Sequence, residues 1–96
     1  MIRSFRDHGT KDIFDGRDTT RARRSLPRHL WSRAWIKLEQ LNEARSLPEL
    51  STPSNRLEKL SGDRNGQHSV RINRQYRICF AWIDAEAWDV EITDYH

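Results

Sequence analysis

The sequence predicts an α+β fold in which helices cover one face of a mostly antiparallel sheet. In the first half of the chain, apolar residues recur at helical spacing, and in the second half they alternate with polar residues. Elements that segregate along a chain in this way pack as a helical layer against an antiparallel sheet. With 96 residues, of which 35% are hydrophobic, the chain is expected to form a single domain over residues 1–96.

The N-terminal region is predicted to hold one short strand and one short helix. Residues 2–5 alternate apolar and polar residues, as a half-buried strand does. Thr10 is expected to cap a helix that runs through Phe14 and is closed by Gly16. Residues 17–28 are rich in arginine and poor in apolar side chains, so they are predicted to form a loop or a mobile basic segment.

The main helix is predicted between Pro27 and Ala44. Its apolar residues recur at intervals of three and four, and they are Leu30, Trp31, Ala34, Leu38 and Leu41. The segment SLPELSTPSN that follows contains two prolines, which remove backbone donors and favour turns. It is expected to cross the surface as an extended connection.

Three strands are predicted in the C-terminal part, joined by short connectors at residues 73–75 and 84–87 into an antiparallel meander. Their core-facing residues are Val70, Ile72, Tyr76, Ile78, Phe80, Trp82, Trp88, Val90 and Ile92. All four tryptophans are expected to pack in or beside the core. The opposite face of the sheet is predicted to carry Arg71, Arg77 and Thr93, which places cations at the centre of a polar surface.

The charge balance favours a polyanionic partner. Seventeen Lys and Arg residues face fourteen Asp and Glu residues, and fourteen of the seventeen cations are arginine. The guanidinium group is always charged and matches the geometry of phosphate. A nucleic acid is therefore the partner that the composition favours.

Cysteine and histidine usage gives no indication of a metal or another cofactor. The single cysteine, Cys79, allows no internal disulfide and no zinc ribbon. The positions of His8, His29 and His68 show no ligand spacing. The start MIRSFRDHG is too polar for a signal peptide, and ICFAWI is too short to cross a bilayer, so a cytoplasmic protein without membrane contact is expected.

Three side chains suited to phosphodiester chemistry are expected near the polar face: Glu58, Arg77 and His96. RNA is cut without metal when a base deprotonates the ribose 2′-hydroxyl, a cation stabilises the phosphorane, and an acid protonates the departing 5′-oxygen. A carboxylate, a guanidinium and an imidazole meet these three needs. By spacing alone this set is a weak signal, because a small basic domain contains many such triples.

The run NRLEKLSGDRNGQHSVRINRQYRICFAW from Asn55 to Trp82, followed by the terminal DYH, resembles the HigB-type toxins of the RelE superfamily. These are the growth-inhibiting halves of bacterial toxin–antitoxin pairs. The resemblance implies a messenger RNA endonuclease that enters the ribosomal A site and cuts the codon there. It also implies a helix-turn-helix antitoxin of the HigA type, through which alone the toxin reaches operator DNA.

The resemblance also implies roles for residues. Asp94, Tyr95 and His96 match the terminal motif that contributes to the family's active site, and Arg77 matches its phosphate-binding arginine. Some HigB toxins have a histidine where this chain has Glu58 and a lysine where it has a serine at position 61. The YoeB-like branch, however, uses a Glu, Arg and His set. By this match Glu58 is the general base, Arg77 the transition-state clamp and His96 the general acid.

Two geometric alternatives stay open at the C-terminus. Strict alternation from Ile92 puts Tyr95 on the Arg77 side of the sheet and His96 on the core side, so a bulge or a peeling terminus is needed to bring His96 to Arg77. If the last strand is regular to its end, Tyr95 is the better candidate.

The surrounding cations are predicted to hold RNA phosphates through charge: Arg56, Lys59, Arg64, Arg71 and Arg74. Structural alternatives are an ion pair of Arg77 with Glu91, and pairing of Glu58 with Arg56 or Lys59. The cluster at residues 17–28 either contacts ribosomal RNA, contacts an acidic antitoxin, or has no structure. The competing function is a binding module with this fold that acts on RNA, the ribosome or another target without cutting.

Overall fold

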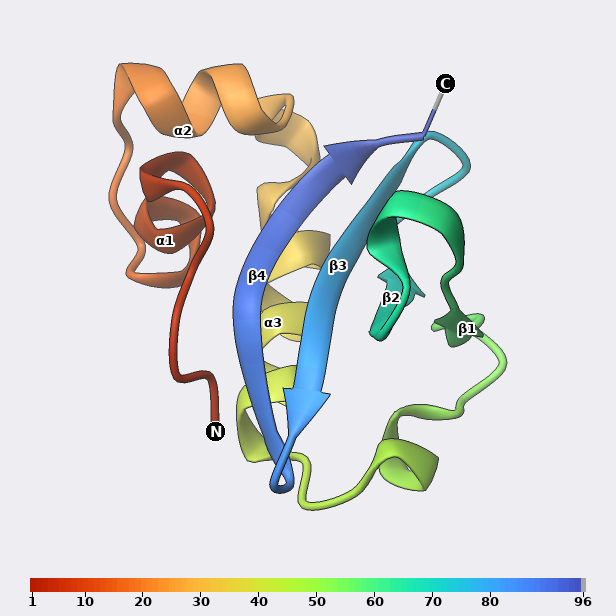
Figure 1. Ribbon diagram of the computed structural model, residues 1–96. Coiled ribbons are helices and arrows are strands. Elements are labelled where there is room, and N and C mark those ends of the chain that lie inside the picture. Colours follow the sequence, from red (N-terminus) through yellow and green to blue (C-terminus); the bar gives the residue numbers. More distant parts are fainter. Residues whose placement is uncertain (96) are drawn as a thin grey trace.

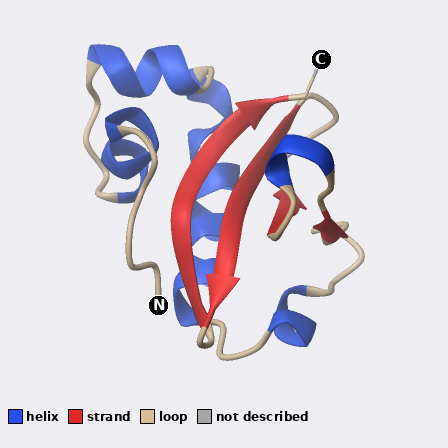
Figure 2. Cartoon of the chain, in the orientation of Figure 1, coloured by secondary structure: helices blue, strands red, loops and turns tan. Residues whose placement is uncertain are grey.

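The structure is a computed structural model, and it describes residues 1–95. Its helices are α1 (His8–Phe14), α2 (Thr20–Ser25) and α3 (Trp31–Glu43), and its strands are β1 (Glu58–Lys59), β2 (Gln67–Arg71), β3 (Tyr76–Ile83) and β4 (Glu86–Asp94). The strands form one antiparallel sheet in the order β1-β2-β3-β4, with α3 lying across one face (Figures 1 and 2). The predicted α+β class and the antiparallel meander are confirmed.

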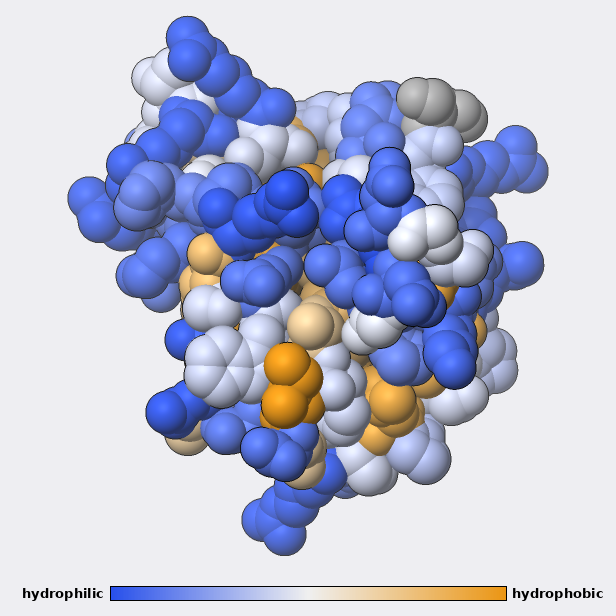
Figure 3. All heavy atoms as spheres, in the orientation of Figure 1, coloured by the Kyte–Doolittle hydropathy of each residue, from blue (hydrophilic) through white to orange (hydrophobic). Residues whose placement is uncertain are grey.

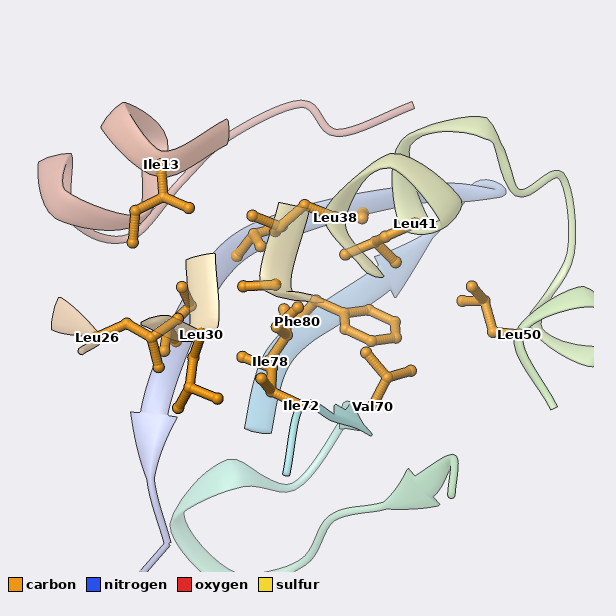
Figure 4. Packing of buried hydrophobic residues seen from close by; sticks show 14 of the residues in the cluster. Ile13, Leu26, Leu30, Leu38, Leu41, Leu50, Val70, Ile72, Ile78 and Phe80 are labelled. Carbon is orange, nitrogen blue, oxygen red and sulfur yellow. The ribbon is translucent and has the colours of Figure 1, made fainter. Parts of the chain in front are cut away.

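The hydrophobic core lies between α3 and the sheet. Alternation along β3 buries Ile78 and Phe80 completely, and they share one cluster with Leu38 and Leu41 of α3 (Figure 4). The apolar residues of the helical pattern and those of the twofold pattern therefore pack against each other in one interface. Truncating a buried phenylalanine to alanine typically costs about 3–5 kcal/mol, so Phe80 contributes a large share of the stability.

The N-terminal segment follows β4 without forming a regular strand. Only Ile2 and Phe5 make bridges, each parallel, to Ala87 and Val90. Between these bridges, β4 carries a bulge: its register to β3 shifts between Cys79 and Ala81, and Asp89 has a φ of 53°. Residues 2–5 therefore do not form the regular strand that was predicted. The bulge in β4 prevents residue-by-residue pairing along this edge.

The bulge also turns Trp88 away from the core. Trp88 pairs with Ala81 and lies on the face away from α3, 36% exposed, beneath the Arg3 guanidinium at 6.0 Å from its ring centre. Ala87 takes the fully buried position instead. The prediction that Trp88 faces the core is thus wrong. Trp35, which was expected in or beside the core, is 44% exposed and donates its indole N–H to the Phe14 carbonyl.

Two helical assignments also need correction. The N-cap of α1 is Asp7, not Thr10: its carboxylate accepts the Thr10 backbone N–H at 2.9 Å and the Thr10 hydroxyl at 2.7 Å. Gly16 follows the helix with a φ of 75°, as predicted for a helix end. Residues 17–28, predicted as a loop, contain α2, which is capped by the Thr19 hydroxyl and packs on α1.

The predicted main helix is confirmed as α3, preceded by a 3-10 turn, η1 (Arg28–Leu30). Two further 3-10 turns are η2 (Leu47–Leu50) and η3 (Gly62–Arg64). The connection predicted as extended therefore holds a turn, closed by Glu49, which accepts the Ser46 backbone N–H at 2.9 Å. This reciprocal cap satisfies backbone donors at the start of η2.

Candidate functional site

The site is built around Arg77, which lies near the start of β3 and points to the face of the sheet opposite α3. Its side chain is only 8% exposed. The guanidinium donates from Nε to the Ser69 hydroxyl at 2.7 Å and from Nη2 to the Arg56 carbonyl at 2.6 Å. A buried charge held by such bonds keeps one orientation. The remaining Nη1 nitrogen lies 3.9 Å from Oε1 of Glu58.

The segment before β1 is shaped to supply these partners. Arg56 adopts a left-handed conformation with a φ of 43°, and its carbonyl accepts the Arg77 bond. Asn55, 1% exposed, anchors the segment by donating from its amide to the Leu50 carbonyl at 3.0 Å and accepting the Arg71 backbone N–H on its own carbonyl at 2.6 Å. Glu58 then follows in β1, paired with Ser69 of β2.

A cleft of about 490 Å³ opens beside the Arg77–Glu58 pair. Seven residues line it: Arg56, Glu58, Arg71, Asn73, Arg74, Arg77 and Tyr95. Tyr95 is 45% exposed, and its ring centre lies 5.7 Å from the Arg77 guanidinium carbon. The sheet face turned away from α3 is in view in Figure 3, where it is mostly hydrophilic.

Positive charge is concentrated in this cleft by the sheet register. Arg71 and Arg77 are direct cross-strand partners, and like charges in that arrangement repel. Glu58 is the one carboxylate among the described lining residues, and its side chain is 55% exposed. The cleft therefore favours an anion such as phosphate, which relieves the repulsion between the guanidinium groups.

The predicted site residues are only partly brought together. Glu58, Arg77 and Tyr95 line the cleft with Arg56, Arg71 and Arg74, whereas Lys59 and Arg64 do not. Alternation turns Lys59 to the other side of β1, opposite His68. Arg64 makes a 2.8 Å ion pair with Glu91. The ion pair of Arg77 is with Glu58, and not with Glu91 as the structural alternative had it.

The end of β4 is regular. Thr93 pairs with Arg77 and Asp94 with Tyr76, so Asp94 lies on the side of the sheet away from the cleft and accepts a hydrogen bond from the Gln75 amide at 3.0 Å. Tyr95 continues the alternation onto the Arg77 side, and its backbone N–H donates to the Gln75 carbonyl at 2.7 Å. His96, the predicted general acid, lies outside the described residues.

Two supporting residues were missed by the sequence reasoning: Ser69 and Asn55. Ser69 is fully buried beneath Arg77, and a signal for it existed, because it shares the outward side of β2 with Arg71. Asn55 stands in a serine- and proline-rich segment where a polar residue is unremarkable in sequence. Its burial depends on contacts from α3 that no local pattern reveals.

The arrangement supplies a carboxylate that can take a proton and a fixed cation that can stabilise an oxyanion. Among residues 1–95, no group of three or more His, Cys, Asp or Glu side chains is placed to hold a metal ion. Within the same range, no helix is long and apolar enough to cross a membrane.

The antiparallel sheet backed by one main helix agrees with the fold that the resemblance to RelE-like toxins predicts. The family model for HigB, the RelE-like toxin of a type II toxin–antitoxin system, matches residues 3–96. The chain belongs to this HigB-like family, and as a toxin of a type II system it has an antitoxin partner.

Individual relatives support this assignment. Endoribonuclease HigB of Proteus vulgaris is 30% identical over 96 residues, which cover all of both chains. Toxin HigB-1 of Vibrio cholerae serotype O1 is 32% identical over 88 residues, which cover 91% of this chain and 90% of the relative. Among solved structures, the YoeB–YefM complex from Staphylococcus aureus contains a chain with the same fold, at a TM-score of 0.61 and 14% identity, covering 100% of this chain and 98% of that one.

Proposed function

We propose that this protein is an endoribonuclease that cuts messenger RNA in the ribosomal A site by transesterification without a metal. The observation that carries the proposal is the Arg77 guanidinium, fixed by Ser69 and Arg56 and facing Glu58 at 3.9 Å in a cleft lined by arginines. A relative named an endoribonuclease, the Proteus vulgaris protein, aligns over the whole chain.

In the proposed reaction, Glu58 removes the proton from the ribose 2′-hydroxyl. The 2′-oxygen then attacks the adjacent phosphorus, and the bond from phosphorus to the 5′-oxygen breaks, leaving a 2′,3′-cyclic phosphate. Arg77 stabilises the negative charge that builds on the phosphoryl oxygens. In the proposal His96, from the terminal motif, donates the proton that the departing 5′-oxygen needs, and Tyr95, which lies on the Arg77 side, is the alternative donor.

Tyr95 is also proposed to stack on a base of the RNA at the cleft. Its exposed ring stands beside Arg77 on the side where a nucleotide enters, and aromatic rings of this kind stack on bases. Arg56, Arg71 and Arg74 hold the phosphates on either side through charge. Lys59, Arg64 and Asp94 lie outside this cleft, so we assign them smaller contributions to RNA binding or to the terminal segment.

The partners follow from family membership. The proposal includes a helix-turn-helix antitoxin of the HigA type, contact with operator DNA through that antitoxin alone, and action in the cytoplasm, where translating ribosomes are found. It requires no cofactor.

The deciding experiment uses translating ribosomes on a defined message. The wild type is compared with Glu58→Gln, Arg77→Ala and His96→Gln, and with Glu86→Gln as a control carboxylate that pairs with Arg3 at 3.6 Å. We expect cleavage in the A site with a 2′,3′-cyclic phosphate end. The rate should fall by about 10²–10⁴ for Glu58→Gln and for His96→Gln, and by about 10²–10³ for Arg77→Ala. The control should cut as fast as the wild type.

A different result identifies the competing function. If the wild type and all four variants inhibit translation equally and the message stays intact, the protein is a binding module and the nuclease proposal is wrong.

A further inference from the structure

A second basic pocket, of about 540 Å³, adjoins the cleft and extends onto α3. Its described lining has five cations and no carboxylate, and consists of Arg33, Lys37, Pro53, Ser54, Arg56, Arg71, Ile72, Asn73 and Arg74. Arg56, Arg71, Asn73 and Arg74 line the cleft as well. The two cavities therefore share a wall, and cations line both of them, from Arg77 in the cleft to Arg33 and Lys37 on α3.

Lys37 is the unusual member of this pocket. Its side chain is buried, at 8% exposure, although it stands on a surface helix. Its ammonium group donates to the Ser54 hydroxyl at 2.9 Å and to the Asn55 side-chain oxygen, both of which are neutral. Among residues 1–95, no carboxylate lies within ion-pair distance of Lys37, Arg33, Arg56, Arg71 or Arg74.

A buried ammonium without a counter-ion is a cost to the folded protein. Burial lowers the pKa of Lys37, and the neighbouring Arg33 charge lowers it further. An anion in the pocket offsets both effects, because its charge and its hydrogen bonds favour the protonated ammonium group. The pocket is thus set up to gain from binding an anion.

We propose that this pocket binds a second phosphodiester of the same RNA strand, next along the chain from the phosphate held at Arg77. The inference rests on the proposed function for the identity of the strand. A single strand carries a phosphate at every nucleotide, so two adjoining cationic cavities with a shared wall match its repeating charge. Lys37 and Arg33 then anchor the RNA on the side of the pocket formed by α3.

The asparagine that holds Lys37 also connects the two cavities. Asn55 accepts the Lys37 bond on its side chain, while its backbone carbonyl accepts the Arg71 N–H and the next residue, Arg56, accepts the Arg77 bond. The position of Lys37 relative to Arg77 is therefore fixed through a short stretch of buried chain. That rigidity sets which phosphate the second pocket receives.

The test uses RNA that cannot be cut, so that binding is measured without chemistry. A 2′-O-methyl hexanucleotide and a 2′-O-methyl dinucleotide, which has a single phosphodiester, are titrated against the wild type, Lys37→Gln and Arg33→Gln. For the hexanucleotide, we expect each variant to bind about tenfold more weakly and the slope of log affinity against log salt to shrink by about 0.7. Dinucleotide binding should not change.

The control is Arg45→Gln, which removes the same charge from an exposed position outside both cavities. If Lys37→Gln fails to fold, as judged by circular dichroism, the exposed Arg33→Gln decides the question. Hexanucleotide affinity and salt slope equal to those of the wild type in Arg33→Gln and in folded Lys37→Gln would overturn the inference.

A second experiment, with ribosomes, distinguishes messenger RNA from ribosomal RNA as the source of the phosphate. Binding to ribosomes without a message is measured for the same proteins. Loss of affinity for these empty ribosomes with unchanged hexanucleotide binding would assign the pocket to ribosomal RNA and refute the second message phosphate. If the wild type cuts no message on ribosomes but hexanucleotide binding still depends on Lys37, the nuclease proposal fails and the phosphate site stands.

Discussion

At the scale of single residues, the chemistry of the cleft depends on how the Arg77 guanidinium is held. Ser69 is buried beneath it and accepts its Nε–H at 2.7 Å, while the Arg56 carbonyl accepts from Nη2. These two bonds leave Nη1 on the side of Glu58. In the proposed reaction Ser69 is therefore a positioning residue, since it would act on RNA only through Arg77.

Ser69→Ala should lower both stability and activity. Removing the hydroxyl leaves a buried charged donor without its partner, which typically costs about 1–3 kcal/mol. Urea unfolding measures that loss, with Ser32→Ala at an exposed position on α3 as the control. In ribosome cleavage assays, the rate at saturating RNA should fall more than the apparent affinity, whereas Ser69→Thr, which keeps the hydroxyl, should recover part of it. Equal rates in Ser69→Ala and the wild type would mean that Arg77 needs no such support.

At the scale of elements, α1 and α2 are joined by a polar contact rather than by a large apolar face. Asp12 is 2% exposed and accepts bonds from Arg21 Nε at 2.6 Å and from the Thr19 hydroxyl at 2.7 Å. These bonds lower the pKa of Asp12 from 3.8 to about 2, with the Arg21 bond as the largest cause. The Asp12 carboxylate thereby ties the start of α2 to α1.

This contact predicts an acid-sensitive part of the stability. The Asp12 contribution is complete above the unfolded pKa of 3.8 and is lost as the pH falls toward about 2, because the unfolded chain takes up the proton first. Asp12→Asn should therefore melt at a lower temperature than the wild type at pH 7, and the two proteins should converge between pH 4 and 2. Asp15→Asn, which removes an exposed pair with Lys11, is the control. A difference in melting temperature that does not change with pH would contradict this account.

The same contact explains why α2 was not predicted. Ala22 is the buried residue of that helix, so there is no apolar stripe to recognise, and its support comes from Asp12 in another element. The bulge in β4 escaped prediction for a related reason: the sequence around Asp89 alternates normally, and only contacts with Ser4 and β3 show the shift. By contrast, α3, β2 and β3 have strong periodicity of their own and were predicted correctly.

At the scale of the whole molecule, α3 covers one face of the sheet and leaves the other face, with the cleft, uncovered by it. The net charge of +3 is small, but cross-strand pairing gathers arginines at one end of the open face. Alternation was enough to place Arg71 and Arg77 there. The contributions of Arg33 and Lys37 were not predictable, although Lys37 falls on the apolar stripe between Ala34 and Leu41, where a lysine is out of place.

Clustering rather than net charge should control RNA binding. Arg74→Gln and Arg24→Gln lower the net charge equally, but only Arg74 lines the two cavities. For the uncleavable hexanucleotide, we expect Arg74→Gln to reduce the salt slope by about 0.7 and Arg24→Gln to leave it unchanged. Affinity measured between 50 and 200 mM salt checks this expectation. Equal slopes in the two variants would show that binding depends on the overall charge.

The buried position of Asn55 predicts where toxin-inactivating mutations will be found. Its side chain is enclosed by the protein, yet its contacts fix the backbone and the lysine that frame both cavities. Cells that survive forced production of the toxin are expected to carry inactivating changes at this amide as well as at the arginines themselves. Some inactive alleles would then carry a substitution at a residue that does not contact RNA.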